Sequence, residues 1–245
     1  MFLDPDDEFA LDMCETMYNK ITNSDAQIVK CNMNYLSKDH ERLGYEYDKH
    51  QQEVEIDCDK EVPPSSVSVC NAIHDRNFLL KKNIMFPPFQ NGEDMVFFVT
   101  EFLNAKKIIH LNSYHGYKYY VNEEVSHSLT PSKKNLNGVL YGYLETKKII
   151  EKFNRTEIYC KFFSETCFSF FLRIVDYKGK DKKEYLKIFY DFEKSINCNL
   201  TFNHLWMNIV NKFIMKKQFT IAMIILNTFS CIKKTPLLKM YRKTL

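Results

Sequence analysis

Phe2-Leu3-Asp4-Pro5-Asp6-Asp7-Glu8-Phe9 places four carboxylates within five positions, directly after two apolar residues. One interpretation is a turn followed by a helix start, because aspartate caps helices and complements the helix N-terminal dipole. The other is a ligand site at the C-terminal edge of a short strand formed by Phe2 and Leu3, where open α/β sheets bind their ligands. Closely spaced carboxylates suit Mg²⁺ or Mn²⁺, and a metal-bound diphosphate needs only one or two of them.

A second carboxylate pair, Glu93 and Asp94, follows Asn91 and Gly92. The apolar residues after it recur at helical spacing: Met95, Phe98, Phe102 and Leu103. We expect an amphipathic helix over residues 93–105, with Asn91 as its N-cap and two acids in its first turn. If the helix start lies in a cleft, Asp94 or Glu93 could also accept a proton from a hydroxyl group.

Five motifs in a fixed order connect these clusters to a known family. Residues 2–9 resemble the F-L-D-x-D-D segment of family 2 glycosyltransferases of the GT-A type, residues 76–87 resemble the R-x-F-L…N-x-I-x-F-P stretch, and residues 92–98 resemble G-E-D-x-x-F-F. Ala105-Lys106-Lys107-Ile108, and then Tyr119-Tyr120 with Ser126 to Ser128, continue the same order. Each motif alone is weak, but together they make roughly residues 1–130 similar to that family.

The resemblance implies an enzyme that transfers a sugar from a nucleotide-diphosphate sugar to a glycan or lipid-linked acceptor, with inversion. Asp4 and Asp6 would be the D-x-D pair at the metal, with Asp6 the direct ligand of Mn²⁺ or Mg²⁺ and Asp4 nearer the nucleotide. The cation would neutralise the departing diphosphate. Asp94 would be the general base on the acceptor hydroxyl, and Glu93 would support it. The implied fold is α/β: a partial GT-A (Rossmann-like) mixed sheet in residues 1–130, followed by a basic α-helical region in residues 131–245.

The chain departs from the family pattern in three places. In the family, the nucleotide-binding half of the sheet lies upstream of the D-x-D strand, whereas Met1 stands at the start of this strand. We therefore expect that translation starts upstream, that the gene is broken, or that a partner chain supplies this half. Cys70-Asn71-Ala72 stands where the family has Trp-Asn-Lys, and Val121 stands where an arginine often follows the tyrosines, so basic contacts are lost. The alternative function is a non-catalytic remnant, or a membrane-surface interaction module whose carboxylates are only helix caps.

Periodicity assigns the remaining elements. One helix is expected over residues 10–22, with its apolar face formed by Leu11, Cys14, Met17, Tyr18 and Ile21, and another over residues 76–82. Strands are expected at 25–35, 108–111 and 117–121, with a short strand or helix entry at 67–73. Residues 37–66 predict a long loop or two edge strands. From residue 132 on, the pattern is helical, with breaks at 177–180 and 197–201.

Charge divides the chain into two regions. Residues 1–100 hold 19 acidic and 9 basic side chains (−10), and the remainder holds 12 acidic and 25 basic side chains (+13). A basic region can meet nucleic acid or an anionic membrane. The chain has no RNA-binding signature and no Cys/His finger spacing, so we expect an anionic membrane surface rather than nucleic acid.

The segment 202–226 is the candidate for that membrane contact. It combines lysines with apolar residues at helical spacing: Trp206, Ile209, Phe213, Phe219 and Ile224 with Lys212, Lys216 and Lys217. The pattern indicates either a core helix pair with solvated lysines or an interfacial helix. Positive charge continues at Lys233, Lys234 and through residues 239–243.

Several classes of protein are disfavoured. The longest apolar run, residues 221–226, is far shorter than the ~20 residues of a membrane span, and the acidic start is unlike a signal peptide. The eight cysteines form no C-x-x-C pair, which disfavours structural zinc and favours reduced thiols. G-x-G-x-x-G and P-loop motifs are absent. These features predict a cytoplasmic protein, or one peripheral at the inner membrane face.

Overall fold

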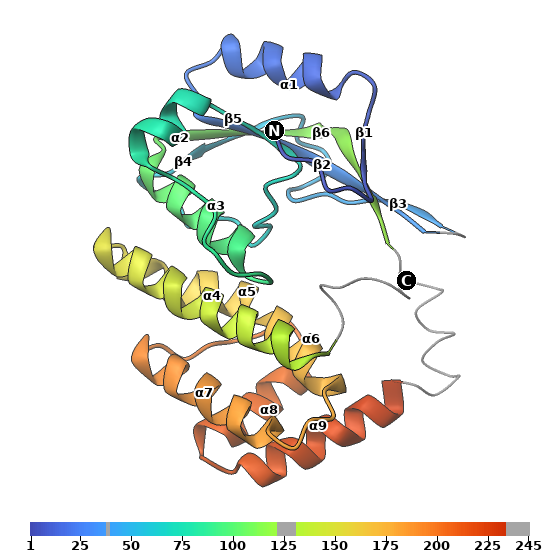
Figure 1. Ribbon diagram of the computed structural model, residues 1–245, viewed down its shortest axis with the longest axis vertical. Coiled ribbons are helices and arrows are strands. Elements are labelled where there is room, and N and C mark those ends of the chain that lie inside the picture. Colours follow the sequence, from blue (N-terminus) through green and yellow to red (C-terminus); the bar gives the residue numbers. More distant parts are fainter. Residues whose placement is uncertain (38–39, 122–130, 234–245) are drawn as a thin grey trace. The chain divides into compact units, whose positions relative to one another are not determined.

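The chain forms two compact units. A computed structural model describes residues 1–37, 40–121 and 131–233 (Figure 1). The first unit comprises Met1–Pro88 and Glu93–Ser126, and the second comprises Phe89–Gly92 and His127–Leu245. Ser126 to Ser128 of the motif series, the predicted boundary near residue 130 and the basic residues from Lys234 on lie outside the described residues.

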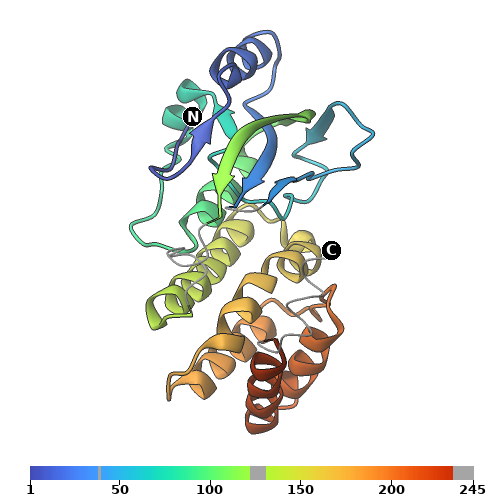
Figure 2. The ribbon, with the colours of Figure 1, turned by 90° about the vertical axis from the view of Figure 1, so that its right-hand side faces the viewer.

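A mixed six-stranded sheet is the centre of the first unit. Its two longest strands, β2 (Ile28–Leu36) and β6 (Lys107–Tyr120), pair in parallel side by side (Figure 2). Four short strands run antiparallel to them: β1 (Glu8–Phe9) and β4 (Val54–Asp57) beside β6, and β3 (Glu41–Leu43) and β5 (Ala72–His74) beside β2. The predicted α/β class, with a mixed sheet and a helical C-terminal region, is confirmed. Of the two predictions for residues 37–66, the pair of strands is the one observed.

Helices cover both faces of this sheet. They are α1 (Met13–Thr22), α2 (Arg76–Lys82) and α3 (Glu93–Asn104). A side chain added at Gly116 would meet Met13 of α1 and Cys31, so α1 lies on the face that carries Cys31. The Lys30 ammonium lies 4.6 Å above the ring of Phe98, so α3 covers the opposite face (Figure 1). This alternation of Lys30 and Cys31 follows from the two-residue period of a strand.

The N-terminal stub does not form the predicted strand. The Phe2 ring instead packs edge-on against Phe86 and Phe97, with centroids 5.1 and 5.7 Å away, and the rings of Phe86 and Phe97 stack at 4.2 Å. Apolar burial against α3 therefore fixes this segment, where the prediction had assumed pairing in a sheet. Leu3 contributes little to the burial, because its side chain is half exposed.

Two further predictions for this unit need correction. The strands predicted at 108–111 and 117–121 are one strand, β6, because an irregular register around Asn32 accommodates the polar residues between them. α1 buries Met13 and Met17, whereas Leu11 and Tyr18 of the predicted apolar face are exposed. The helix exists as predicted, but the methionines at spacing i, i+4 define its buried stripe.

A buried hydrogen bond between His74 and Glu101 joins β5 to α3. His74 Nδ1 lies 2.6 Å from Glu101 Oε1, and His74 Nε2 lies 3.2 Å from the carbonyl oxygen of Val69. The Glu101 side chain is fully buried and that of His74 nearly so. Removing one partner of such a pair leaves the other desolvated without compensation. The pair therefore holds the segment that ends in β5 against the helix that begins at Glu93.

Glu101→Ala should destabilise the first unit by about 3 kcal/mol, because His74 would lose its buried partner. The exposed ion pair between Lys60 and Asp57 has the same N···O distance of 2.6 Å and provides the matched comparison. Lys60→Ala should change stability little, because solvent screens that pair. Urea unfolding of the three proteins checks both expectations. Equal losses in the two variants would contradict the structural importance assigned to the buried pair.

The second unit is a bundle of helices. Its elements are α4 (Lys133–Lys152), the 3₁₀ helix η1 (Thr156–Ile158), α5 (Tyr159–Thr166), α6 (Phe168–Asp176), α7 (Lys182–Ser195), α8 (Leu205–Met215) and α9 (Phe219–Lys233). The predicted breaks at 177–180 and 197–201 are confirmed. The core is aromatic: Phe170 stacks on Phe189 at 4.6 Å, and Phe163 meets Phe192 edge-on at 4.9 Å.

The segment 202–226 forms part of the pair α8 and α9, in which Trp206 stacks on Phe229 at 4.5 Å. Residues of both helices are buried in the bundle: Met207, Val210, Ile214, Ala222 and Leu226. Ile209 and Ile224, which the pattern placed on the apolar stripe, are 41% and 60% exposed. No helix within residues 1–37, 40–121 and 131–233 is long and apolar enough to cross a membrane.

Candidate functional site

The aspartate cluster forms a tight turn that leads into β1, and no helix starts there. The backbone N–H of Asp7 donates to the carbonyl oxygen of Asp4 at 3.1 Å, with Pro5 and Asp6 between them. Proline suits the second position of such a turn because its ring presets the backbone angle φ. Asp4 and Asp6 are exposed, whereas Asp7 is buried. The turn therefore offers two carboxylates to solvent and keeps the third inside.

Asp94 lies near this turn, at the start of α3. Burial, together with the negative charges of Glu93 and Asp4, raises the pKa of the Asp94 carboxyl to about 7. The influence of Asp4 places the two predicted site carboxylates within electrostatic reach of each other. Glu93 acts on Asp94 through its charge, as a neighbour in the first turn of the helix.

Asn91 does not take the predicted N-cap position. α3 begins at Glu93, so Gly92 precedes the helix and Asn91 lies one residue further out. The Asn91 side-chain amide donates to Oδ1 of Asn135 at 2.9 Å, within the second unit. The backbone of Gln90 passes so close to α4 that a side chain at Gly138 would lie 2.0 Å from its carbonyl oxygen, which explains the glycine there.

Cys70 lies beside Asp4. Its thiol donates to Asp4 Oδ2 across 3.7 Å. Burial, together with the charges of Asp4 and Asp94, raises the pKa of this thiol to about 12. Cys70 therefore remains a neutral donor at physiological pH. Asp4 is thus in contact with Cys70 and influences Asp94 through its charge, although the sequence separates the three residues widely.

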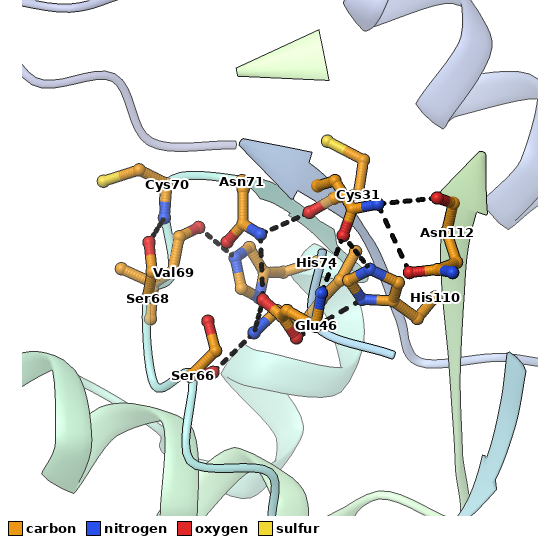
Figure 3. A network of polar contacts seen from close by, with 12 residues as sticks. Cys31, Glu46, Ser66, Ser68, Val69, Cys70, Asn71, His74, His110 and Asn112 are labelled. Carbon is orange, nitrogen blue, oxygen red and sulfur yellow. Dashed lines mark hydrogen bonds and ion pairs between the residues drawn. The ribbon is translucent and has the colours of Figure 1, made fainter. Parts of the chain in front are cut away.

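A buried polar network holds the loop that carries Cys70 (Figure 3). Lys30, which is fully buried, donates from Nζ to the carbonyl oxygen of Ser66 at 2.7 Å and lies 3.4 Å from Glu46 Oε1. The Asn71 amide donates to the carbonyl oxygen of Cys31 and, at 3.3 Å, to Glu46 Oε1. These contacts fix the loop on both sides of Cys70, so the position of its thiol depends on a desolvated lysine–glutamate pair.

Lys30 lies opposite Ala72, the position at which the family has a lysine. Lys30 is the register partner of Ala72 across β2 and β5, and cross-strand partners lie on the same face of a sheet. A buried ammonium is therefore present opposite the predicted gap, but its contacts are Ser66 and Glu46. The loss of a basic contact to substrate at Ala72 stays a prediction.

The carboxylates fit a divalent cation bound together with a diphosphate. Within the described part of the chain, no three His, Cys, Asp or Glu side chains are arranged to hold a metal ion by themselves. Asp4 and Asp6 nevertheless offer exposed hard oxygen atoms, and repulsion among Asp4, Glu93 and Asp94 already raises a pKa in the site. One or two carboxylates suffice when a nucleotide supplies the other ligands. The residue types and the excess negative charge both suit such a cation.

Sequence reasoning missed Tyr117 and gave Asp7 no role of its own. The Tyr117 hydroxyl donates to Asp7 Oδ2 at 2.7 Å, and the backbone N–H of Tyr120 donates to Asp7 Oδ1 at 2.8 Å. Burial raises the pKa of Asp7, although these two hydrogen bonds oppose the shift. Nothing in the spacing of the sequence pairs position 117 with position 7, because strand pairing alone brings them together.

Several solved structures resemble the fold of this chain. Residues 1–349 of S. aureus TarS in complex with UDP-GlcNAc match with a TM-score of 0.64 and 14% identity, over 94% of this chain and 66% of that one. The same fragment in complex with UDP gives 0.59 and 14%, over 94% and 65%, and a longer S. aureus TarS chain gives 0.64 and 15%, over 93% and 39%. TarS is a GT-A-type family 2 glycosyltransferase. The chain has a glycosyltransferase-like fold.

The likeness concerns the glycosyltransferase fold alone, because identity is only 14–15% in these matches. The chain spans less than two thirds of the length of these TarS chains. No protein-family model and no curated protein sequence matches it. The roles of Asp4, Asp6, Glu93 and Asp94, the localisation, and the expectation that a nucleotide-binding half is missing or comes from another chain stay predictions.

Asp94→Asn should stabilise the protein at pH 8 by on the order of 2 kcal/mol. This gain is smaller than the free energy that corresponds to the full pKa shift, because the carboxyl group is partly solvated. The pKa of Asp94 is about 7 in the fold, against 3.8 ordinarily. The stability that the protonated Asp94 carboxyl contributes is fully present below pH 3.8 and is lost as the pH rises through 7. The advantage of Asp94→Asn over the wild type should therefore shrink between pH 8 and pH 5.

Denaturant unfolding at pH 8 and pH 5 measures this difference. Asp191→Asn, on the exposed side of α7, provides the charge-matched control and should show no such pH dependence. A destabilised Asp94→Asn protein at pH 8 would mean that the carboxylate stabilises the fold, contrary to its surroundings.

Proposed function

We propose that this protein transfers a sugar from a nucleotide-diphosphate sugar to a hydroxyl group of a glycan or lipid-linked acceptor, with inversion at the sugar. The proximity of Asp4 to Asp94 beside Cys70 carries the proposal. A donor-side carboxylate and a basic carboxylate must both face the same sugar, and positioning of this kind accounts for much of the rate of group transfer. The glycosyltransferase-like fold supports it.

The turn residues would serve the donor. Asp6 and Asp4 would hold Mn²⁺ or Mg²⁺ against the diphosphate, Asp6 directly and Asp4 nearer the nucleotide. The cation supplies neutralisation of the negative charge that develops as the bond between sugar and diphosphate breaks. TarS has been solved with UDP-GlcNAc and with UDP, which makes a uridine nucleotide the first donor to test.

Asp94 would serve the acceptor by taking the proton of its hydroxyl group. A carboxylate with a pKa of about 7 is a stronger base than an ordinary one, yet is ionised in about half of the molecules at neutral pH. Attack from the side opposite the leaving diphosphate inverts the anomeric centre. Glu93 would support Asp94 through its charge, which raises the proton affinity of its neighbour.

Asp6→Ala should abolish the Mn²⁺-dependent part of UDP binding, because the metal loses its direct protein ligand. Asp94→Asn should leave that binding in place and reduce transfer by roughly 10²–10⁴-fold, the usual contribution of a general base. Calorimetry with UDP in the presence and absence of Mn²⁺, followed by an assay of UDP release from a UDP-sugar with acceptor, separates the two effects.

Asp191→Asn serves as the control for both measurements. Wild-type protein that binds UDP equally well with and without Mn²⁺ would contradict the metal role of the turn. Full transfer activity in Asp94→Asn would contradict the base. A protein that binds no nucleotide would favour a non-catalytic interaction module.

The charge of the second unit favours a lipid-linked acceptor over a soluble one. Residues 194–245 contain no aspartate or glutamate. On α8, Leu205 and Ile209 are 76% and 41% exposed, and the exposed Lys212 and Lys216 continue the same side of the helix at spacings of three and four residues. An apolar stripe that continues into lysines suits the boundary of an anionic lipid surface. We propose that α8 contacts such a surface, where a lipid-linked acceptor would be presented.

Wild-type protein should sediment with vesicles of phosphatidylglycerol and phosphatidylcholine, and should stay in solution with phosphatidylcholine alone. Lys212→Glu/Lys216→Glu should weaken the association at least about tenfold, since each lysine near an anionic surface contributes about 1 kcal/mol. Lys183→Glu/Lys187→Glu on α7 changes the same charge at exposed positions and is the control. Equal binding to both vesicle types, or equal loss in both variants, would contradict a specific role of α8.

A further inference from the structure

The ring of Tyr117 packs in the core, whereas its hydroxyl forms hydrogen bonds with the Asp4–Asp7 turn. The side chain is 1% exposed, and its ring meets Phe9 edge-on with centroids 5.9 Å apart. The hydroxyl donates to Asp7 Oδ2 at 2.7 Å and receives the backbone N–H of Asp4 at 3.5 Å. One buried hydroxyl thus contacts the turn at both ends, Asp4 and Asp7.

Asp7 completes the attachment of the turn to β6. Its Oδ1 accepts the backbone N–H of Tyr120, and its own N–H donates to the carbonyl oxygen of Asp4. Both carboxylate oxygens are therefore engaged by residues of one strand. The exposed carboxylates of Asp4 and Asp6 are carried on a turn whose orientation these bonds set.

Packing alone does not explain a tyrosine at this position. A phenylalanine would fill the same volume next to Phe9, whereas a buried hydroxyl costs free energy unless it is hydrogen-bonded. Here both partners of the hydroxyl, the Asp7 carboxylate and the Asp4 N–H, belong to the turn. The chemistry of the residue therefore concerns the turn.

We propose that Tyr117 is a positioning residue, which acts through Asp7 and the Asp4 backbone to direct the Asp4 and Asp6 carboxylates toward the place where Asp94 lies. The inference rests on the proposed function, since it assigns Tyr117 to the metal and diphosphate side of that site. Residues that orient metal ligands in this way usually change metal affinity by 10–100-fold when they are replaced.

Tyr117→Phe tests the hydroxyl while the ring is kept. Tyr114→Phe is the matched control, because Tyr114 lies on the same strand and donates to Asp12 Oδ1 at the same 2.7 Å, away from the turn. Tyr117→Phe should weaken binding of Mn²⁺ with UDP about tenfold, measured well below the melting temperature of every variant. Tyr114→Phe should bind as the wild type does. Hydrogen exchange of the Asp7 and Tyr120 amides in the nucleotide-free protein reads the turn directly, and only Tyr117→Phe should accelerate it.

The outcomes separate this inference from the proposed function. Faster exchange together with weaker binding in Tyr117→Phe alone supports the positioning role. Wild-type affinity in Tyr117→Phe overturns it, even if the melting temperature falls, because a purely structural residue would lower stability without moving affinity. Equal weakening in Tyr114→Phe also overturns it. Wild-type protein that binds neither Mn²⁺ nor UDP overturns the proposed function itself, and this result is seen before any variant is made.

Discussion

Parallel pairing of β2 with β6 is the constraint on which the first unit depends. Two parallel neighbours cannot be joined by a hairpin, so the chain between β2 and β6 forms a crossover, which also contributes β3, β4 and β5 to the sheet. That crossover contains the loop with Cys70 and the helix that begins with Glu93 and Asp94. The return of the chain as β6 then brings Tyr117 beside the Asp4 turn. The crossover and the return strand thus bring Cys70, Asp94 and Tyr117 into the unit that also carries the Asp4 turn.

The elements most accurately predicted from sequence are those whose ends are fixed by local chemistry. α2 has the predicted bounds because the Asp75 carboxylate accepts the N–H groups of Asn77 and Phe78, and because Asn83 adopts the left-handed conformation that ends a helix. Predictions that depended on tertiary partners were less accurate. Phe2 could be assigned to a strand from its neighbours alone, but the rings of Phe86 and Phe97 determine its conformation, and they lie far along the chain.

The residues of the candidate site likewise fall into those that local sequence motifs select and those that only tertiary contacts reveal. Asp4, Asp6, Glu93 and Asp94 could be selected from sequence because motif spacing records which residue types a reaction needs. The supporting residues could not be selected. Lys30 lies in the middle of an apolar strand pattern, where its full burial against Glu46 and Phe98 has no local signal. Asp7 continues the run of aspartates in the sequence, and only its hydrogen bonds to Tyr117 and the Tyr120 backbone show that it faces inward.

Asp94 differs from other desolvated carboxylates of the first unit in the groups that surround it. Glu101 is paired with His74, Glu46 with Lys30, and Asp7 with two hydrogen-bond donors. No ion pair joins Asp94 to a cation among the described residues, and the charges nearest to it are negative. Burial raises the pKa of Asp7 as well, but two hydrogen bonds oppose that shift, whereas every influence on the pKa of Asp94 raises it. Uncompensated charge of this kind is costly in the free protein and is expected where a ligand supplies the missing positive charge. The electrostatics of the apo fold thus point to the same residues as the motif, by an argument that does not depend on family resemblance.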